Sequence, residues 1–215
     1  MKTNNISFTS KINFVPESVF SKYRYARGVY VDVAARKNLV CKVSNQNVWT
    51  DYICSCVSGA AINTKTKDIA GFHLFHSKKI FQKCDEFLED VFSFVPDADS
   101  ALIIGGKDTR LTPYSVKIFD KIAEEFKKRI PNLTIFERHK KLNSGSDICY
   151  FADRDEWLIN TLYSDNIFGF HAKDVLSQEE LVNCFGKISI GDGDKLFMND
   201  IPVTFVNKTD EFVKF

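Results

Sequence analysis

The sequence predicts an α+β fold, in which a β-sandwich-like core has two long amphipathic helices packed outside it. Short segments that favour strands outnumber the helical segments, as is typical of sandwiches. Two longer segments carry apolar residues at intervals of three and four, which indicates helices with one buried face. The 215 residues include 20 Phe and are 44% hydrophobic, so the chain can bury one full core. We therefore predict a single domain over residues 1–215.

Strands are predicted first in the amino-terminal half. Residues 28–43 alternate in part between apolar and polar, which indicates two strands around a turn near Arg36. Residues 51–62 and 68–75 are rich in small, β-branched and aromatic side chains. Because the polar residues 63–67 separate these two segments, we expect a pair of antiparallel strands joined by a turn.

The two amphipathic helices follow. Residues 78–95 predict the first helix, and residues 101–106 then predict a buried strand that ends in a Gly-Gly turn. Thr112 is suited to cap the second helix and Pro113 to occupy its first position. Pro131 is expected to end that helix, because proline cannot continue it.

Strands dominate again in the carboxyl-terminal half. Three are predicted at residues 133–136, 148–151 and 157–159, with turns at residues 143–145 and 153–155. Ser177 and Glu180 have the spacing of a capping box, which predicts a short helix that ends at Gly186. Residues 187–206 contain three apolar runs broken by polar turns, a pattern typical of a β-meander.

Charge and composition exclude several classes of function. Lys and Arg total 29 and Asp and Glu total 28, so the net charge of +1 favours neither nucleic acid nor an acidic membrane as a partner. Residues 1–14 lack the apolar run of a signal peptide or a spanning helix. We expect a cytoplasmic protein, or one secreted into a host cell without a cleavable signal peptide. The six cysteines are expected to be reduced thiols.

A thiol and an imidazole fall on the two strands predicted to pair. If residues 68–75 return antiparallel to residues 51–62, His73 comes back to the level of Cys56. A His that hydrogen-bonds a Cys lowers the pKa of the thiol, and the thiolate is the nucleophile. The small residues after Cys56 leave room for a substrate, so Ser55, Val57 and Ser58 are predicted to bind the substrate or its oxyanion.

Four residues carry a resemblance to the CheD-type chemoreceptor glutamine deamidases. In that family a Thr lies six residues before the nucleophilic Cys in a T-x(4)-S-C segment, and a His follows on the next strand. Thr50, Ser55, Cys56 and His73 match this arrangement. The wider fold group of the family includes deamidating bacterial toxins such as cytotoxic necrotizing factor. The resemblance implies a CheD-like fold for this chain.

The resemblance covers about residues 47–159. The strand at residues 101–106 resembles the strand of the family that ends in Gly-Gly, and residues 143–145 resemble its glycine-containing turn. Family glycines before the Ser-Cys pair are replaced here by bulkier residues, among them Tyr52, which changes what can enter the site. Residues 165–215 have no counterpart and are an extension of unknown role.

The mechanism implied by the resemblance is hydrolysis of a glutamine side-chain amide through a thioester, without metal or cofactor. Cys56 attacks the amide, and His73 takes the thiol proton and gives a proton to the departing ammonia. Thr50 orients His73, which completes a Cys-His-Thr triad. The partner is a protein with an exposed glutamine: a host protein if the chain is a bacterial effector or toxin, or a chemoreceptor if it acts in chemotaxis.

Three alternatives stand beside this reading. A binding module on the same scaffold would need no reactive thiol, and another cysteine amidohydrolase or protease would use the same pair on a different bond. Cys54, Cys56, His73 and His76 have the residue types of a zinc site. Strand alternation places the two cysteines on one face of their strand and the two histidines on opposite faces of theirs. We therefore expect no metal site, and a packing role for the Cys54 side chain.

Overall fold

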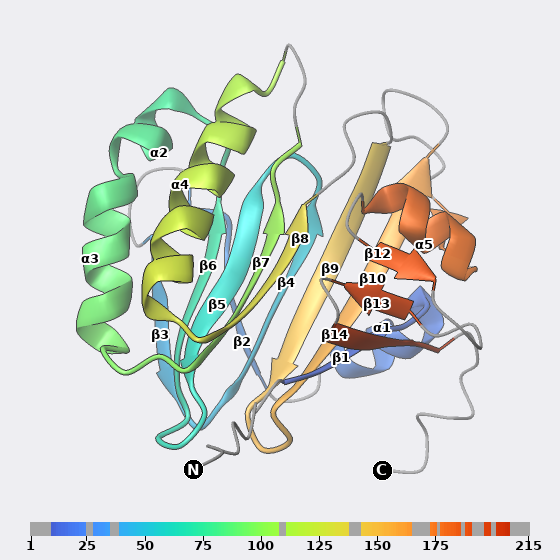
Figure 1. Ribbon diagram of the computed structural model, residues 1–215, viewed down its shortest axis with the longest axis horizontal. Coiled ribbons are helices and arrows are strands. Elements are labelled where there is room, and N and C mark those ends of the chain that lie inside the picture. Colours follow the sequence, from blue (N-terminus) through green and yellow to red (C-terminus); the bar gives the residue numbers. More distant parts are fainter. Residues whose placement is uncertain are drawn as a thin grey trace, which may run out of the picture.

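The described residues of the computed structural model form two facing sheets together with helices (Figure 1). The structure describes residues 10–24, 28–34, 39–107, 111–137, 143–164, 173–175, 177–185, 188–190, 196–198 and 201–206. The mixture of strands and helices with two sheets confirms the α+β class. No helix within these residues has the length and apolar character needed to cross a membrane.

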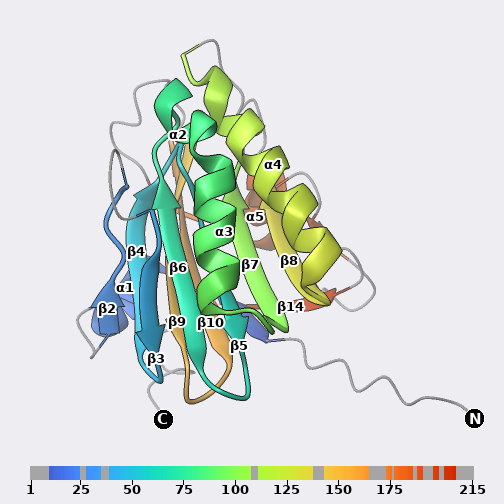
Figure 2. The same cartoon turned by 90° about the vertical axis from the view of Figure 1, so that its left-hand side faces the viewer.

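The smaller sheet is the middle layer of the molecule (Figures 1 and 2). Its strands lie in the order β3 (Cys41–Ser44), β6 (Asp68–Leu74), β5 (Val57–Asn63), β7 (Ser100–Gly105) and β8 (Asn132–Glu137). β5 and β6 are antiparallel, with Val57 opposite Leu74 and Asn63 opposite Asp68. This register confirms the strand pair that the sequence predicts across the polar turn.

The larger sheet packs against one face of the smaller sheet. Its strands lie in the order β12 (Ile188–Ile190), β13 (Leu196–Met198), β14 (Ile201–Phe205), β1 (Lys11–Phe14), β10 (Glu156–Ser164), β9 (Asn143–Phe151), β4 (Asn47–Ile53) and β2 (Gly28–Tyr30), and β11 (Lys173–Asp174) pairs with β10. An apolar core that includes Ile62, Ile104 and Trp157 lies between the two sheets. β12, β13 and β14 pair antiparallel in chain order, which confirms the meander.

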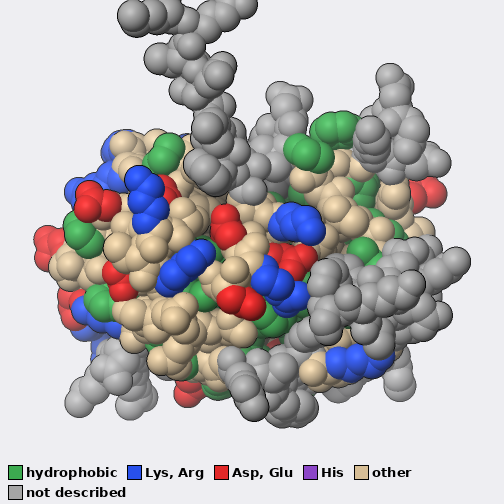
Figure 3. Space-filling view, turned by 90° about the horizontal axis from the view of Figure 1, so that it is seen from below, with side chains coloured by type: hydrophobic (Ala, Val, Ile, Leu, Met, Phe, Trp, Pro, Cys, Tyr) green, Lys and Arg blue, Asp and Glu red, His purple; other side chains and the backbone are tan. Residues whose placement is uncertain are grey.

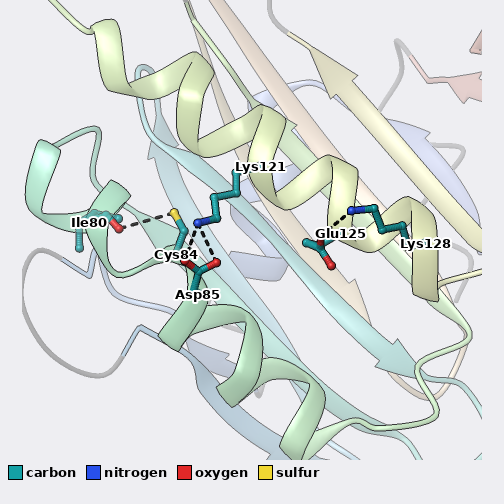
Figure 4. Close-up of polar contacts among 6 residues, drawn as sticks. All are labelled: Ile80, Cys84, Asp85, Lys121, Glu125 and Lys128. Carbon is teal, nitrogen blue, oxygen red and sulfur yellow. Dashed lines mark hydrogen bonds and ion pairs between the residues drawn. The ribbon is translucent and has the colours of Figure 1, made fainter.

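Three helices cover the outer face of the smaller sheet: α2 (Lys78–Gln82), α3 (Cys84–Phe94) and α4 (Pro113–Arg129) (Figure 2). Phe72 of β6 meets Phe87 of α3 and Phe126 of α4, with ring centroids 5.1 and 6.1 Å apart. Lys121 of α4 also reaches Asp85 of α3, at 2.7 Å (Figure 4). An exposed ion pair contributes at most about 1 kcal/mol, so the buried rings dominate this contact.

Two helices lie elsewhere. α1 (Glu17–Arg24) packs Val19 and Phe20 on the outer face of the larger sheet. α5 (Gln178–Cys184) begins at the predicted capping box, in which Ser177 and Glu180 bond each other's backbone amides. The predicted end of this helix, Gly186, lies outside the described residues.

The structure corrects the first predicted helix. Residues 78–95 form two helices, because the chain turns more tightly at Lys83. The Lys83 amide bonds the Ile80 carbonyl at 2.9 Å, and the Cys84 thiol bonds the same oxygen at 3.6 Å (Figure 4). This pattern replaces the regular bond to the residue four positions back and separates α2 from α3.

One strand prediction and one turn prediction are also corrected. Residues 51–62 do not form one strand: β4 ends at Ile53 in the larger sheet, and β5 begins at Val57 in the smaller one. The predicted turn at residues 143–145 lies inside β9, where Gly145 pairs with Leu162. The two strands predicted within residues 28–43 are present as β2 and β3. They belong to different sheets, since β2 pairs with β4 and β3 with β6, and the turn near Arg36 lies outside the described residues.

Charged side chains of both signs are interspersed on the face of the molecule shown in Figure 3. This distribution agrees with the near balance of basic and acidic residues in the sequence.

Candidate active site

The predicted site lies where the chain crosses from the larger to the smaller sheet. Residues 54–56 bend between the end of β4 and the start of β5. Because β5 is antiparallel to β6 and β7, its start lies beside the ends of those strands, at the upper end in Figure 1. Thr50 is contributed by β4, Cys56 by the bend and His73 by β6. Both sheets therefore supply the site.

Thr50 and His73 meet in the core between the sheets. His73 has no solvent-exposed surface, and its Nδ1 lies 2.7 Å from the Oγ1 of Thr50. The same hydroxyl donates to the Val31 carbonyl at 2.8 Å. A hydroxyl has one proton and a carbonyl can only accept, so Thr50 must accept from the His73 Nδ1–H. The proton of the imidazole is therefore on Nδ1, and Nε2 carries the lone pair.

The Nε2 atom of His73 is a buried proton acceptor. It has no hydrogen-bond partner among the described residues. Burial lowers the pKa of His73 from 6.5 to about 4, although Asp51 and Asp32 oppose the shift. The imidazole is thus neutral at neutral pH, with a lone pair that no other described group uses.

Cys56 directly precedes β5 and has 8% of its surface exposed. Ser58, two residues later, is paired with His73. Cys56 belongs to the bend and not to the β5–β6 ladder, which begins at the pair Val57–Leu74. The hydrogen bond expected between Cys56 and His73 is not formed, because the Nε2 of His73 has no partner among the described residues.

Gly105 holds the backbone of Cys56 from the side of β7. A Cβ at Gly105 would lie 2.5 Å from the Cys56 carbonyl oxygen and 3.0 Å from the Val57 Cα. The φ of Gly105 is +140°, a conformation that other residues rarely adopt. The Gly-Gly end of the predicted strand is thus a structural contact of the bend that carries Cys56.

Residues 31–34 close one side of the site, and sequence reasoning missed them. The Val31 carbonyl accepts from Thr50, and the Ala34 amide donates to the His73 carbonyl at 2.7 Å. These residues connect β2 of the larger sheet to the edge of the smaller one. No local pattern in the sequence marks this role, because it arises from backbone atoms.

The three residues predicted to bind substrate or oxyanion have different surroundings. Ser58 is fully buried, and its hydroxyl donates to the Phe72 carbonyl at 2.7 Å. Val57 is also fully buried. Ser55 is half-buried, and its hydroxyl lies 2.8 Å from the Nδ1 of His76. A binding role for these three residues stays a prediction. The proton of the Ser58 hydroxyl is already donated to the Phe72 carbonyl.

Cys54 and Cys56 differ in exposure. Cys54 is exposed and Cys56 is buried, because the bend interrupts the strand alternation that would place both on one face. Across the described residues, no group of three or more His, Cys, Asp or Glu could hold a metal ion. The four residues of the zinc alternative therefore do not form a metal cluster.

Asp147, which the sequence did not indicate, holds the backbone directly before the bend at residues 54–56. Asp147 of β9 is 3% exposed and accepts the Tyr52 amide at 2.9 Å. Tyr52 has a φ of +54° and lies in a bulge of β4 between Thr50 and Ile53. Its carbonyl accepts the Cys54 amide at 2.8 Å. The turn of the chain from one sheet to the other is thus held by hydrogen bonds on both sides of Tyr52.

The sequence matches no protein-family model and no curated protein. One solved structure to which the chain is similar is the C-terminal domain of CNFy from Yersinia pseudotuberculosis, at 13% identity and a TM-score of 0.32. The match covers 60% of this chain and 52% of that domain, so the chain spans about half of the length of its neighbour.

Proposed function

We propose that the protein is a cysteine-dependent hydrolase that deamidates glutamine side chains of a protein substrate. Cys56 is the nucleophile, His73 is the general base and Thr50 orients His73. The observation that supports the proposal is the neutral, buried His73, whose Nδ1 is bonded to Thr50 and whose Nε2 lone pair has no partner among the described residues. The resemblance of Thr50, Ser55, Cys56 and His73 to the CheD-type deamidases supports the same roles.

The first half of the reaction forms a thioester. The Cys56 sulfur attacks the carboxamide carbon of glutamine while its proton moves to the His73 Nε2. Because the pKa of His73 is about 4, its protonated form is a strong acid that readily passes the proton to the amide nitrogen. The carbon–nitrogen bond then breaks and ammonia leaves. A base with this low pKa does not hold an ordinary thiol ionised at rest, so proton transfer accompanies the attack.

The second half of the reaction hydrolyses the thioester and regenerates the free enzyme. The neutral Nε2 takes a proton from water, whose oxygen attacks the thioester carbon. The carbon–sulfur bond breaks, and the thiol regains its proton from His73. The net change converts one side-chain amide and one water into a carboxylic acid and ammonia, without metal or cofactor. Thr50 keeps the ring oriented throughout, because its hydroxyl stays bonded to Val31 and His73.

The substrate is proposed to be a protein with an exposed glutamine. A host protein is the partner if the chain is a bacterial effector or toxin, and a chemoreceptor is the partner if it acts in chemotaxis. We propose further that residues 47–159 are the deamidase-like core of a single CheD-like domain.

The decisive experiment is peptide mass spectrometry of bacterial and eukaryotic cell extracts incubated with the protein. Glutamine-to-glutamate conversion at specific sites is expected with the wild type and is expected to disappear with Cys56→Ala. Cys54→Ala is the matched control, because it removes an exposed thiol two residues away. Conversion that persists in Cys56→Ala would refute the assigned nucleophile.

A thiol-labelling experiment separates an enzyme from a binding module. Iodoacetamide is expected to label Cys56 in the wild type with His73 taking the thiol proton as the sulfur attacks, and much more slowly in His73→Ala, which has no base for that proton. Equal labelling in both proteins, together with no conversion in either extract, would favour a binding module that needs no reactive thiol.

A further inference from the structure

Exposed aromatic side chains lie at the ends of two strands that meet the bend carrying Cys56, Tyr52 near the end of β4 and Phe75 directly after β6. Four large hydrophobic side chains are exposed within the described residues: Tyr30, Tyr52, Phe75 and Leu111. Tyr52 is 73% exposed and lies four residues before Cys56. Phe75 is 40% exposed and directly follows β6. The β5–β6 ladder ends at the pair Val57–Leu74, and Cys56 and Phe75 are the next residue of each strand beyond that pair.

Tyr52 is exposed although its backbone is fixed. Its amide donates to the buried Asp147, and its carbonyl accepts the Cys54 amide. Its φ of +54° is a left-handed conformation that costs an aromatic residue about 1–2 kcal/mol. The bulge requires the left-handed conformation but not the ring, because Gly or Asn adopts it more easily. The fold therefore does not account for an aromatic side chain at this position.

Phe75 is fixed in the same way. Its amide donates to the Ala34 carbonyl at 3.3 Å, and its carbonyl accepts the Ser77 amide at 2.8 Å. The ring packs against His76 with centroids 4.3 Å apart, and the Nδ1 of His76 is bonded to Ser55. The Ser55–His76 pair thus holds the ring of Phe75 in place beside the bend.

We propose that Tyr52 and Phe75 bind hydrophobic side chains of the substrate on either side of the glutamine that Cys56 attacks. This inference rests on the proposed function and names the substrate class: protein segments in which glutamine is flanked by apolar residues. Aromatic side chains with fixed backbones lose little conformational freedom on binding and dominate the affinity of many interfaces. Free glutamine, which lacks such neighbours, is a poor substrate.

The test uses two capped peptides with the sequences Leu-Gln-Leu and Ser-Gln-Ser, and ammonia release is measured. A second pair replaces glutamine by a residue with a chloroacetamide group, and alkylation of Cys56 is measured by mass spectrometry. The wild type is expected to prefer the leucine-flanked member of each pair by at least about tenfold. Tyr52→Gly and Phe75→Ser are each expected to reduce this preference several-fold, whereas Tyr52→Phe and Phe75→Tyr keep it.

The variants separate recognition from folding. Tyr52→Gly is expected to have an unchanged or higher melting temperature, because glycine tolerates the left-handed φ. The loss of preference in a variant of full stability therefore assigns a binding role to the ring. Equal preference in the wild type, Tyr52→Gly and Phe75→Ser would overturn the inference. Selective alkylation without ammonia release would retain the inference and refute deamidation, and no alkylation of Cys56 by either reagent would refute both.

Discussion

Protonation of His73 is predicted to destabilise the fold as the pH falls. In the folded protein the pKa of His73 is about 4, and in the unfolded chain it is the ordinary 6.5. Between these values the unfolded state binds more protons than the folded state, so the free energy of unfolding rises with pH in this window. The stabilisation is fully present above pH 6.5 and is lost as the pH falls toward 4. For these two pKa values, about 2 kcal/mol is lost between pH 7.5 and pH 5.

The assay is urea unfolding at several pH values between 7.5 and 5. Carboxylates also titrate in this range, so the wild type is compared with His73→Gln, which lacks the titrating group. The wild type should lose about 2 kcal/mol more than the variant, equivalent to roughly 4–8 °C in melting temperature for a domain of this size. His76→Gln is the control, because His76 is only half-buried and should change the slope less. Parallel curves for wild type and His73→Gln would refute a neutral, buried His73.

Three more predictions concern the same site. Thr50→Val should lower the free energy of unfolding by about 1–3 kcal/mol, because it leaves the Val31 carbonyl and the His73 Nδ1 without their shared partner, and it should slow the labelling of Cys56 by iodoacetamide. Thr50→Ser should keep both the stability and the labelling rate of the wild type. An unchanged labelling rate in Thr50→Val would argue against an orienting role for Thr50. Gly105→Ala should destabilise by about 1–3 kcal/mol in thermal unfolding, because its Cβ would lie 2.5 Å from the Cys56 carbonyl, and a wild-type melting temperature would contradict that contact. As the pH is lowered, kcat/KM for deamidation should fall with a midpoint near pH 4, where His73 becomes protonated. A midpoint near pH 6.5 would show that the base is not the buried His73.

The sequence was most informative where structure is local. The β5–β6 pair is set by two β-rich runs around a polar turn, and α5 is set by the Ser177–Glu180 capping box. The same hairpin places Ser58 opposite His73, so a pairing of neighbouring strands was enough to predict that His73 returns to the start of β5.

Features that depend on distant parts of the chain were missed. The sequence from β4 to β5 predicts one strand, because its apolar pattern is continuous. The chain passes from the larger to the smaller sheet at residues 54–56 because each half pairs with strands that are distant in the sequence. Residues 143–145 have turn-forming side chains, but pairing with β10 extends them into β9. The bond of Thr50 to the Val31 carbonyl forms only after β2 pairs with β4, so no spacing in the sequence indicates it.

The place of β1 in the larger sheet constrains the order in which the nascent chain can fold. β1 lies parallel to β10 on one side and to β14 on the other. Asn13 of β1 bonds Glu156, which is 143 residues later. During synthesis the amino-terminal strand therefore waits, with both edges unpaired, until β10 and then β14 leave the ribosome. Until then its unpaired backbone groups are open to pairing with strands of other chains.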